Sequence, residues 1–149
     1  MKFSKIIGAL IALVQLASAL GLVVGMHSML GVFSTAMSGG EQGIEIQFTD
    51  PVVVPFSLSP RNGGFVDATL EVRIAMIVDG VEVAYDSASV SIPAGSTIPV
   101  DLELSVPLED AEEYFQEGTE LQWETDISVT SLFDLISFSN HMVMEAGAE

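Results

Sequence analysis

The chain contains no cysteine, and among its 149 residues only four are basic and two are histidine. Without cysteine, a disulfide framework, a thiolate metal site and a cysteine nucleophile are excluded. Neither His27 nor His141 has a second histidine two to four residues away, so no clustered zinc site is indicated. No glycine loop precedes a lysine, which leaves a phosphate cradle unsupported. Stability must therefore come from packing.

Residues for catalysis are scarce as well. A serine nucleophile needs a histidine held against it, but His27 lies in an apolar segment and His141 follows an apolar run near the C-terminus. We expect His141 to be exposed or at a rim, and Trp123 to lie in the core. The acidic cluster at residues 109–113 lacks EF-hand spacing and is expected to be a solvated helix face. The sequence predicts a non-enzymatic protein with no cofactor, metal or small-molecule substrate.

Acidic residues are abundant but confined to one part of the chain. All 21 follow Gly40, and the only basic residues in that part are Arg61 and Arg73, so its formal charge is −19. The N-terminal lysines bring the total to −17. A nucleic-acid partner is excluded, because a phosphate backbone requires a basic surface. A dense carboxylate surface with so little lysine favours a salt-adapted, halophilic source.

The first 40 residues have the opposite character. Lys2 and Lys5 precede a stretch, residues 6–40, that has no charged side chain. About 20 apolar residues cross a bilayer, so the stretch is long enough. The positive-inside rule keeps the lysine end in the cytoplasm. We therefore expect residues 1–37 to form a single-pass anchor in the cell membrane that places the acidic domain on the extracellular side.

A cleaved secretory signal is the competing interpretation of this segment. The sequence Ala17-Ser18-Ala19 fits the small-x-small cleavage pattern, with cleavage after Ala19. The new N-terminus would then be strongly apolar, which favours a retained anchor. Both alternatives export the domain, and they remain open.

Small residues recur along the apolar segment. Ala17, Gly21 and Gly25 are spaced four apart, which on a helix makes a strip where a second helix could approach closely. His27 is expected near the outer membrane interface. Residues 38–42 contain Ser-Gly-Gly and are expected to form a flexible linker that lets the domain reorient.

Residues 43–149 are expected to form one acidic β-sandwich domain. Apolar and polar residues alternate in about seven runs, which indicates half-buried strands that form two packed sheets. The Asp79-Gly80 pair predicts a hairpin turn, and the prolines at 51, 55 and 60 indicate an edge strand or a meandering loop. Residues 109–116 have helical character. The runs are 44–48, 70–74, 81–85, 90–92, 100–106, 121–129 and 132–144.

The second half of this domain resembles the late-embryogenesis-abundant type 2 family, the water-stress and hypersensitive-response domain. The similarity covers the Ser-Ile-Pro-Ala-Gly-Ser-Thr turn at 91–97, the Val-x-Leu-x-Leu strand at 100–106, the helix at 109–116 and the closing strands at 121–138. The family's Asn-Pro-Asn strand start is absent upstream. The resemblance implies an immunoglobulin-like or fibronectin-like sandwich without catalytic residues, of the archaeal or bacterial membrane-anchored type, with a role in stress tolerance or the cell envelope.

Two functions follow from these patterns. The first is a membrane-anchored, outward-facing structural or interaction module of the cell envelope, which contacts lipid through its helix and pairs with itself or with another envelope protein. The second is a subunit of an extracellular filament or matrix that uses the apolar segment for assembly. The state of the N-terminus distinguishes them.

Overall fold

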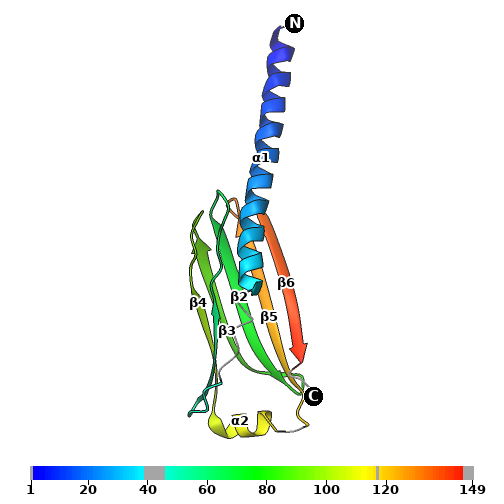
Figure 1. The fold of residues 1–149 in the computed structure, drawn as a ribbon. Coiled ribbons are helices and arrows are strands. Elements are labelled where there is room, and N and C mark those ends of the chain that lie inside the picture. Colours follow the sequence, from blue (N-terminus) through cyan, green and yellow to red (C-terminus); the bar gives the residue numbers. More distant parts are fainter. Residues whose placement is uncertain (1, 39–45, 117, 146–149) are drawn as a thin grey trace.

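A computed structural model of the chain describes residues 2–38, 46–116 and 118–145, with the side chains of the first helix described for residues 7–37. One long helix projects from a domain built mainly of strands (Figure 1). The elements in chain order are α1 (Lys2–Ser38), β1 (Val52–Leu58), β2 (Ala68–Val78), β3 (Val81–Ile92), β4 (Val100–Val106), α2 (Leu108–Tyr114), β5 (Leu121–Ser131) and β6 (Ile136–Glu145).

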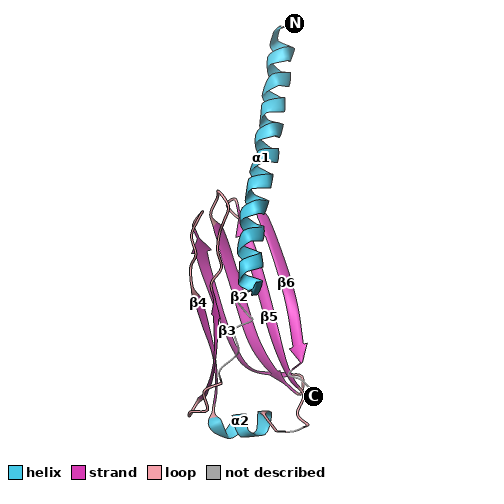
Figure 2. Cartoon of the chain, in the orientation of Figure 1, coloured by secondary structure: helices cyan, strands magenta, loops and turns pink. Residues whose placement is uncertain are grey.

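The strands form two antiparallel sheets. One has four strands in the order β3-β2-β5-β6, and the other pairs β1 with β4. Ala68 is paired with both Ile92 and Ser131, so β2, β3 and β5 end level with one another. We call this the proximal end of the domain, because α1 leaves the domain there; α2 and the β2–β3 turn lie at the opposite, distal end (Figure 2).

The C-terminal half of α1 shares a layer with the small sheet. Met29, Val32 and Ala36 of α1 belong to the same buried cluster as Val54 of β1 and Leu104 of β4. One face of the four-stranded sheet is thus covered by two elements that lie next to each other, the β1–β4 pair and the helix. A two-stranded ribbon alone could not bury a four-stranded sheet, so the helix completes the second layer.

Several local predictions are confirmed. The Asp79-Gly80 turn has positive φ at both residues, 49° and 77°, as a type I′ hairpin requires. The expected strand at 100–106 is β4, whose residues alternate between buried and exposed without exception. The proline-containing segment forms β1, a strand at the edge of the two-stranded sheet, where β4 is its neighbouring strand. A short helix, α2, lies within the acidic segment as expected.

The predicted set of seven strands is wrong in two places, and the described residues contain six. The runs at 81–85 and 90–92 are one continuous strand, β3. Of the run at 44–48, residues 46–48 make only an isolated bridge between Gln47 and Val53, and residues 44 and 45 lie outside the described part. Phe48 was expected on a buried face but is 72% exposed. Alternation across five residues can arise in a segment that no neighbouring strand pairs along its length.

The junction between helix and domain also differs from expectation. The sequence predicts an anchor ending at residue 37 and a linker at 38–42 that lets the domain reorient. Ser38 is the last residue of α1, residues 39–42 lie outside the described part, and the helix from Gly25 to Met37 packs against the sheets. The helix and the sheets therefore share one core.

Candidate functional site

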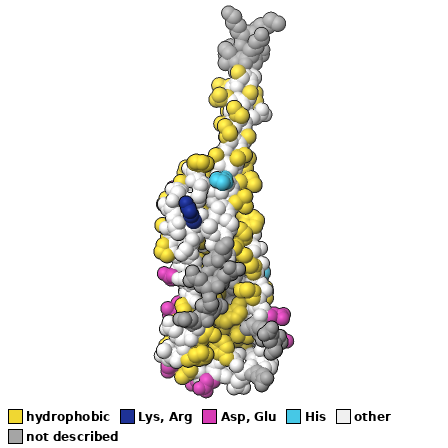
Figure 3. Space-filling model, in the orientation of Figure 1, with side chains coloured by type: hydrophobic (Ala, Val, Ile, Leu, Met, Phe, Trp, Pro, Cys, Tyr) yellow, Lys and Arg dark blue, Asp and Glu magenta, His cyan; other side chains and the backbone are white. Residues whose placement is uncertain are grey.

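The surface of α1 changes character at Gly25. From Ile7 to Val24 the residues are exposed, with only Gly21 and Val24 half-buried, and they include large aliphatic side chains such as Leu13 and Leu16. Beyond this point, buried positions recur at helical spacing: Gly25, Ser28, Met29, Val32 and Ala36. One stripe of the second half thus faces the domain. In Figure 3, yellow hydrophobic side chains cover much of the projecting helix below its grey end.

Two close approaches fix α1 against the proximal end. A Cβ atom on Gly25 would lie 2.6 Å from Leu132 Cδ1 and 2.8 Å from Ile136 Cδ1. A Cβ atom on Gly64 would lie 1.8 Å from Ser28 Oγ and 2.5 Å from Ser28 Cα. Both glycines allow a contact that a larger residue would prevent.

Hydrogen bonds hold the β1–β2 loop in place beneath the helix. Buried Asn62 donates from Nδ2 to the carbonyls of Val66 (2.8 Å) and Ile92 (2.9 Å), and its Oδ1 accepts from the Gly64 N–H (3.0 Å). From α1, Thr35 Oγ1 accepts the Arg61 N–H at 2.8 Å. Since the loop is tied both to the sheet and to the helix, it acts as a rigid seat for α1.

The structure separates the three residues predicted for helix pairing. Ala17 is exposed and Gly21 half-buried on the projecting half, whereas Gly25 is buried against Leu132 and Ile136 of its own chain. Ala19, the predicted cleavage position, is exposed within the projecting half. Cleavage there would leave only residues 20–24 ahead of the packed half of α1.

The other residues that the sequence analysis singled out are His27, Trp123 and the acidic cluster of α2. His27 is exposed, and its ring stacks on Phe65 with a centroid distance of 6.3 Å. Trp123, which was expected in the core, is only partly buried and packs edge-on against Phe56 at 5.9 Å beside the core. The acidic residues of α2 lie at the distal end, and no group of three potential metal ligands is found among the described residues.

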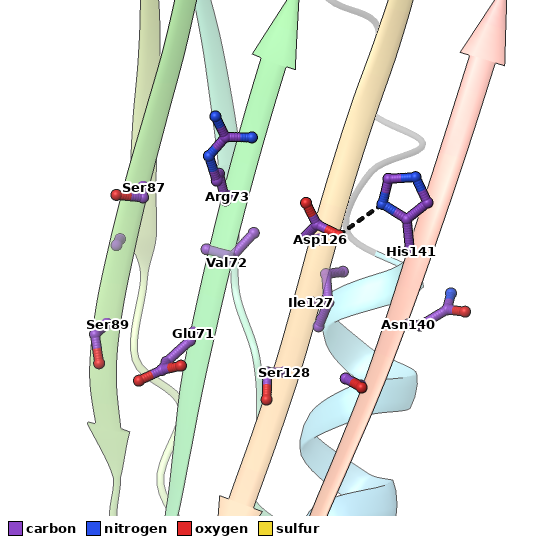
Figure 4. Close-up of a pocket in the computed structure, with 12 residues that line it drawn as sticks. Glu71, Val72, Arg73, Ser87, Ser89, Asp126, Ile127, Ser128, Asn140 and His141 are labelled. Carbon is purple, nitrogen blue, oxygen red and sulfur yellow. Dashed lines mark hydrogen bonds and ion pairs between the residues drawn. The ribbon is translucent and has the colours of Figure 1, made fainter.

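The outer face of the four-stranded sheet carries a shallow polar groove of about 620 Å³. It crosses all four strands, and serines from β3, β5 and β6 line it. From neighbouring strands, Asp126 and His141 point toward each other, with 2.6 Å between Asp126 Oδ1 and His141 Nδ1 (Figure 4). Both side chains are about half exposed, in agreement with the expected exposure of His141.

Arg73 is the cation of this groove. Its guanidinium lies 2.6 Å from Glu82 Oε2 and 5.0 Å from the centroid of the Tyr85 ring. The hydrogen bond with Glu82 raises the pKa of Arg73 above its usual value. The groove is open and holds charge pairs on a flat sheet face, which suits reversible polar contacts with a partner better than the enclosure of a small ligand.

The pairing of Asp126 with His141 was missed in the sequence. Its signal was present in principle, because two antiparallel strands joined by a short turn bring such positions opposite each other, and the observed register aligns this pair. The register depends on the turn at residues 132–135, which the alternation pattern did not locate.

No family model and no curated protein sequence matches the chain. Among solved structures it is similar to a protein from Archaeoglobus fulgidus, with 14% identity and a TM-score of 0.47 over 70% of this chain and 89% of that one. It is also similar to a β-glucuronidase of Bacteroides uniformis (12% identity, TM-score 0.43), of which it covers 12%, with 68% of this chain aligned. A FixG-related protein from Vibrio parahaemolyticus has 8% identity and a TM-score of 0.37, over 69% of this chain and 92% of that one. Likenesses at this level carry no functional conclusion.

Proposed function

We propose that the protein is a non-enzymatic membrane-anchored module whose acidic domain faces outward and makes contacts in the cell envelope. The observation that carries this proposal is the division of α1 at Gly25, with an apolar exposed half followed by a half that belongs to the domain core. An exposed helix of aliphatic residues is costly in water and favourable in lipid.

The length of the exposed half supports a membrane span. Residues 7–24 correspond to about 27 Å of helix at about 1.5 Å per residue, close to the roughly 30 Å hydrocarbon core of a bilayer. The whole stretch Ile7–Met37 is long and apolar enough to cross. Packing against the domain removes Gly25–Met37 from this role, which leaves a span of nearly the required length.

Charge supports the orientation. Lys2 and Lys5 precede the span, and the net charge beyond it is strongly negative. Lysines near a span favour the cytoplasmic side, so the domain faces outward. The polar groove on the four-stranded sheet is then available to an extracellular partner, either a second copy or another envelope protein.

The proposal is tested by fractionation and protease treatment of intact cells. We expect the chain to resist alkaline extraction from membranes, to keep its N-terminal residues by mass analysis, and to lose its domain to external protease. Leu16→Arg should reduce membrane retention, because a charge at mid-span costs about 3 kcal/mol, whereas Leu16→Val should not. A mature chain that begins at Leu20 would contradict the anchor.

A filament subunit is the second candidate, and the same helix favours it. The projecting half still carries Ala17 and Gly21, where a second helix could approach. Because the chain has no cysteine, Ala17→Cys and Gly21→Cys each give a single crosslinking position, and Gly21→Cys is retained even if the chain is cleaved after Ala19. Disulfide-linked dimers formed in high yield in extracellular material would support a filament, while monomers in the membrane fraction would contradict it.

The role in stress tolerance and the immunoglobulin-like or fibronectin-like classification are further proposals that rest on the resemblance of residues 90–138. A deletion strain with unchanged growth under osmotic stress would contradict the former. An experimental structure would test the latter.

A further inference from the structure

Three large apolar side chains stand in solvent at the proximal end of the domain. Phe65 of the β1–β2 loop is 78% exposed, and Phe133 and Leu135 of the β5–β6 turn are 99% and 81% exposed. We call these three residues the apolar rim. Single exposed apolar residues are common on proteins, so their shared location is the informative point.

The rim surrounds the point where α1 leaves the domain. Leu132, next to Phe133, is the residue that packs against Gly25. On the other loop, Phe65 stacks on His27 of α1. Both loops therefore flank the helix at residues 25–27, directly after the exposed span ends at Val24.

The turn that presents Phe133 has a costly backbone. Leu132, Phe133 and Asp134 have φ of 54°, 56° and 63°, a left-handed conformation that costs a non-glycine residue free energy. The turn is closed by a hydrogen bond from Leu135 N–H to the Leu132 carbonyl (3.2 Å) and by one from Thr130 Oγ1 to Asp134 Oδ1 (3.0 Å). Strain of this kind persists where the structure supports it and often marks a functional position.

Charge is distributed to suit a lipid surface at this end. Among the described residues, the acids of the two rim loops are Asp67 and Asp134, and both carboxylates accept local hydrogen bonds, Asp67 Oδ1 from the Ala94 N–H at 3.0 Å. Arg61 lies in the β1–β2 loop as well. The acidic side chains visible in Figure 3 gather in the lower part of the molecule, away from the projecting helix.

We propose that the apolar rim inserts into the outer interface of the bilayer that α1 crosses, so that the domain is seated on the lipid. This inference rests on the proposed function, since it requires α1 to span the membrane. Aromatic residues favour the headgroup level, and a shallow apolar insertion of this kind reaches about 5–10 Å into the interface. Asp134, between the two rim residues of the turn, limits the insertion to that depth.

Spin labels on single cysteines test the inference in the full-length protein. The chain has no cysteine, so Phe133→Cys, Phe65→Cys, Leu16→Cys and Phe48→Cys each give one site. Phe48 is a matched control, because it is an exposed phenylalanine on the segment that leads into β1 from its distal end. The protein is reconstituted in phosphatidylcholine–phosphatidylglycerol vesicles, and relaxation by oxygen is compared with relaxation by a water-soluble nickel chelate.

We expect oxygen to dominate at residues 133 and 65, more strongly still at residue 16, and the nickel chelate to dominate at residue 48. Nickel dominance at 133 and 65 together with oxygen dominance at 16 would overturn the seated domain and leave the anchor standing. Nickel dominance at residue 16 would overturn the anchor itself. Residue 133 could also be protected from both reagents, increasingly so at higher protein-to-lipid ratios. That result would show that the rim contacts a second copy of the chain instead of lipid, and it would overturn the inference.

Discussion

At the scale of single residues, the contact between Gly64 and Ser28 shows how little space separates α1 from its seat. A Cβ atom at Gly64 would overlap Ser28, including its backbone Cα, whereas a Cβ atom at the neighbouring Gly63 would have no atom within 4 Å. The two glycines are adjacent in sequence and differ in what they face. They form a natural pair for substitution.

Gly64→Ala is expected to lower the free energy of unfolding by about 1–3 kcal/mol, because overpacking displaces the helix from its loop. Gly63→Ala should change it by less than about 0.5 kcal/mol. Denaturant unfolding in detergent, followed by the fluorescence of Trp123, measures both. Equal effects of the two substitutions would show that the helix does not rest on this loop.

The left-handed turn gives a second residue-scale prediction. Phe133→Gly should raise the free energy of unfolding by about 1 kcal/mol in detergent, since glycine adopts positive φ without the penalty of a side chain. The side chain of Phe133 is almost wholly exposed, so no packing is lost. Phe65→Gly, at a residue without positive φ, is the control and should give no gain. A stability loss at Phe133 would show that the left-handed backbone is not the dominant cost at this position.

At the scale of elements, α1 has two environments along one helix. Met29 is 5% exposed and its neighbour Leu30 is 54% exposed, although both are aliphatic and adjacent. Met29 faces the strands, and Leu30 faces away from them. The second half of the helix thus contributes to the core through one stripe only.

Met29→Ala is expected to destabilise the domain by about 2–5 kcal/mol, as for other buried large-to-small substitutions, and Leu30→Ala by less than about 0.5 kcal/mol. Amide hydrogen exchange of β2 and β5 in the detergent-solubilised protein is a suitable measurement, because both strands contact α1. Unchanged exchange in Met29→Ala would show that the sheets are stable without the helix.

Much of the strand content was predictable because the acidic domain alternates polar and apolar residues, as in β4. The packing of α1 was not. Residues that face lipid and residues that face a core are both apolar, so Met26 and Leu30 cannot be told from Met29 and Val32 by hydropathy. The polar groove was equally hidden, since the contact between Asp126 and His141 depends on strand register rather than on spacing in sequence.

At the scale of the whole molecule, the net charge predicts a response to salt. The domain carries 21 acids against two arginines, and their mutual repulsion favours the unfolded state. Raising KCl from about 0.1 M to about 1 M shortens the Debye length from about 10 Å to about 3 Å, which screens this repulsion.

We expect the added salt to stabilise the protein by about 1 kcal/mol or more, which corresponds to a rise in Tm of about 4 °C. Thermal unfolding in detergent at increasing KCl measures the effect, with sucrose at matched osmolality as the control for general solute exclusion. A Tm that is flat or falls with KCl would show that repulsion among the carboxylates does not limit stability.

The continuity of α1 from its projecting half into the core has a geometric consequence for encounters with partners. The strands of the large sheet run alongside the helix, so in a membrane that α1 crosses upright the groove would face sideways, parallel to the lipid surface (Figure 1). A partner diffusing in the same membrane would approach this face from the side, at a constant height above the lipid. The search for that partner would then take place in two dimensions. The groove would keep one orientation, because α1 continues directly into the domain core.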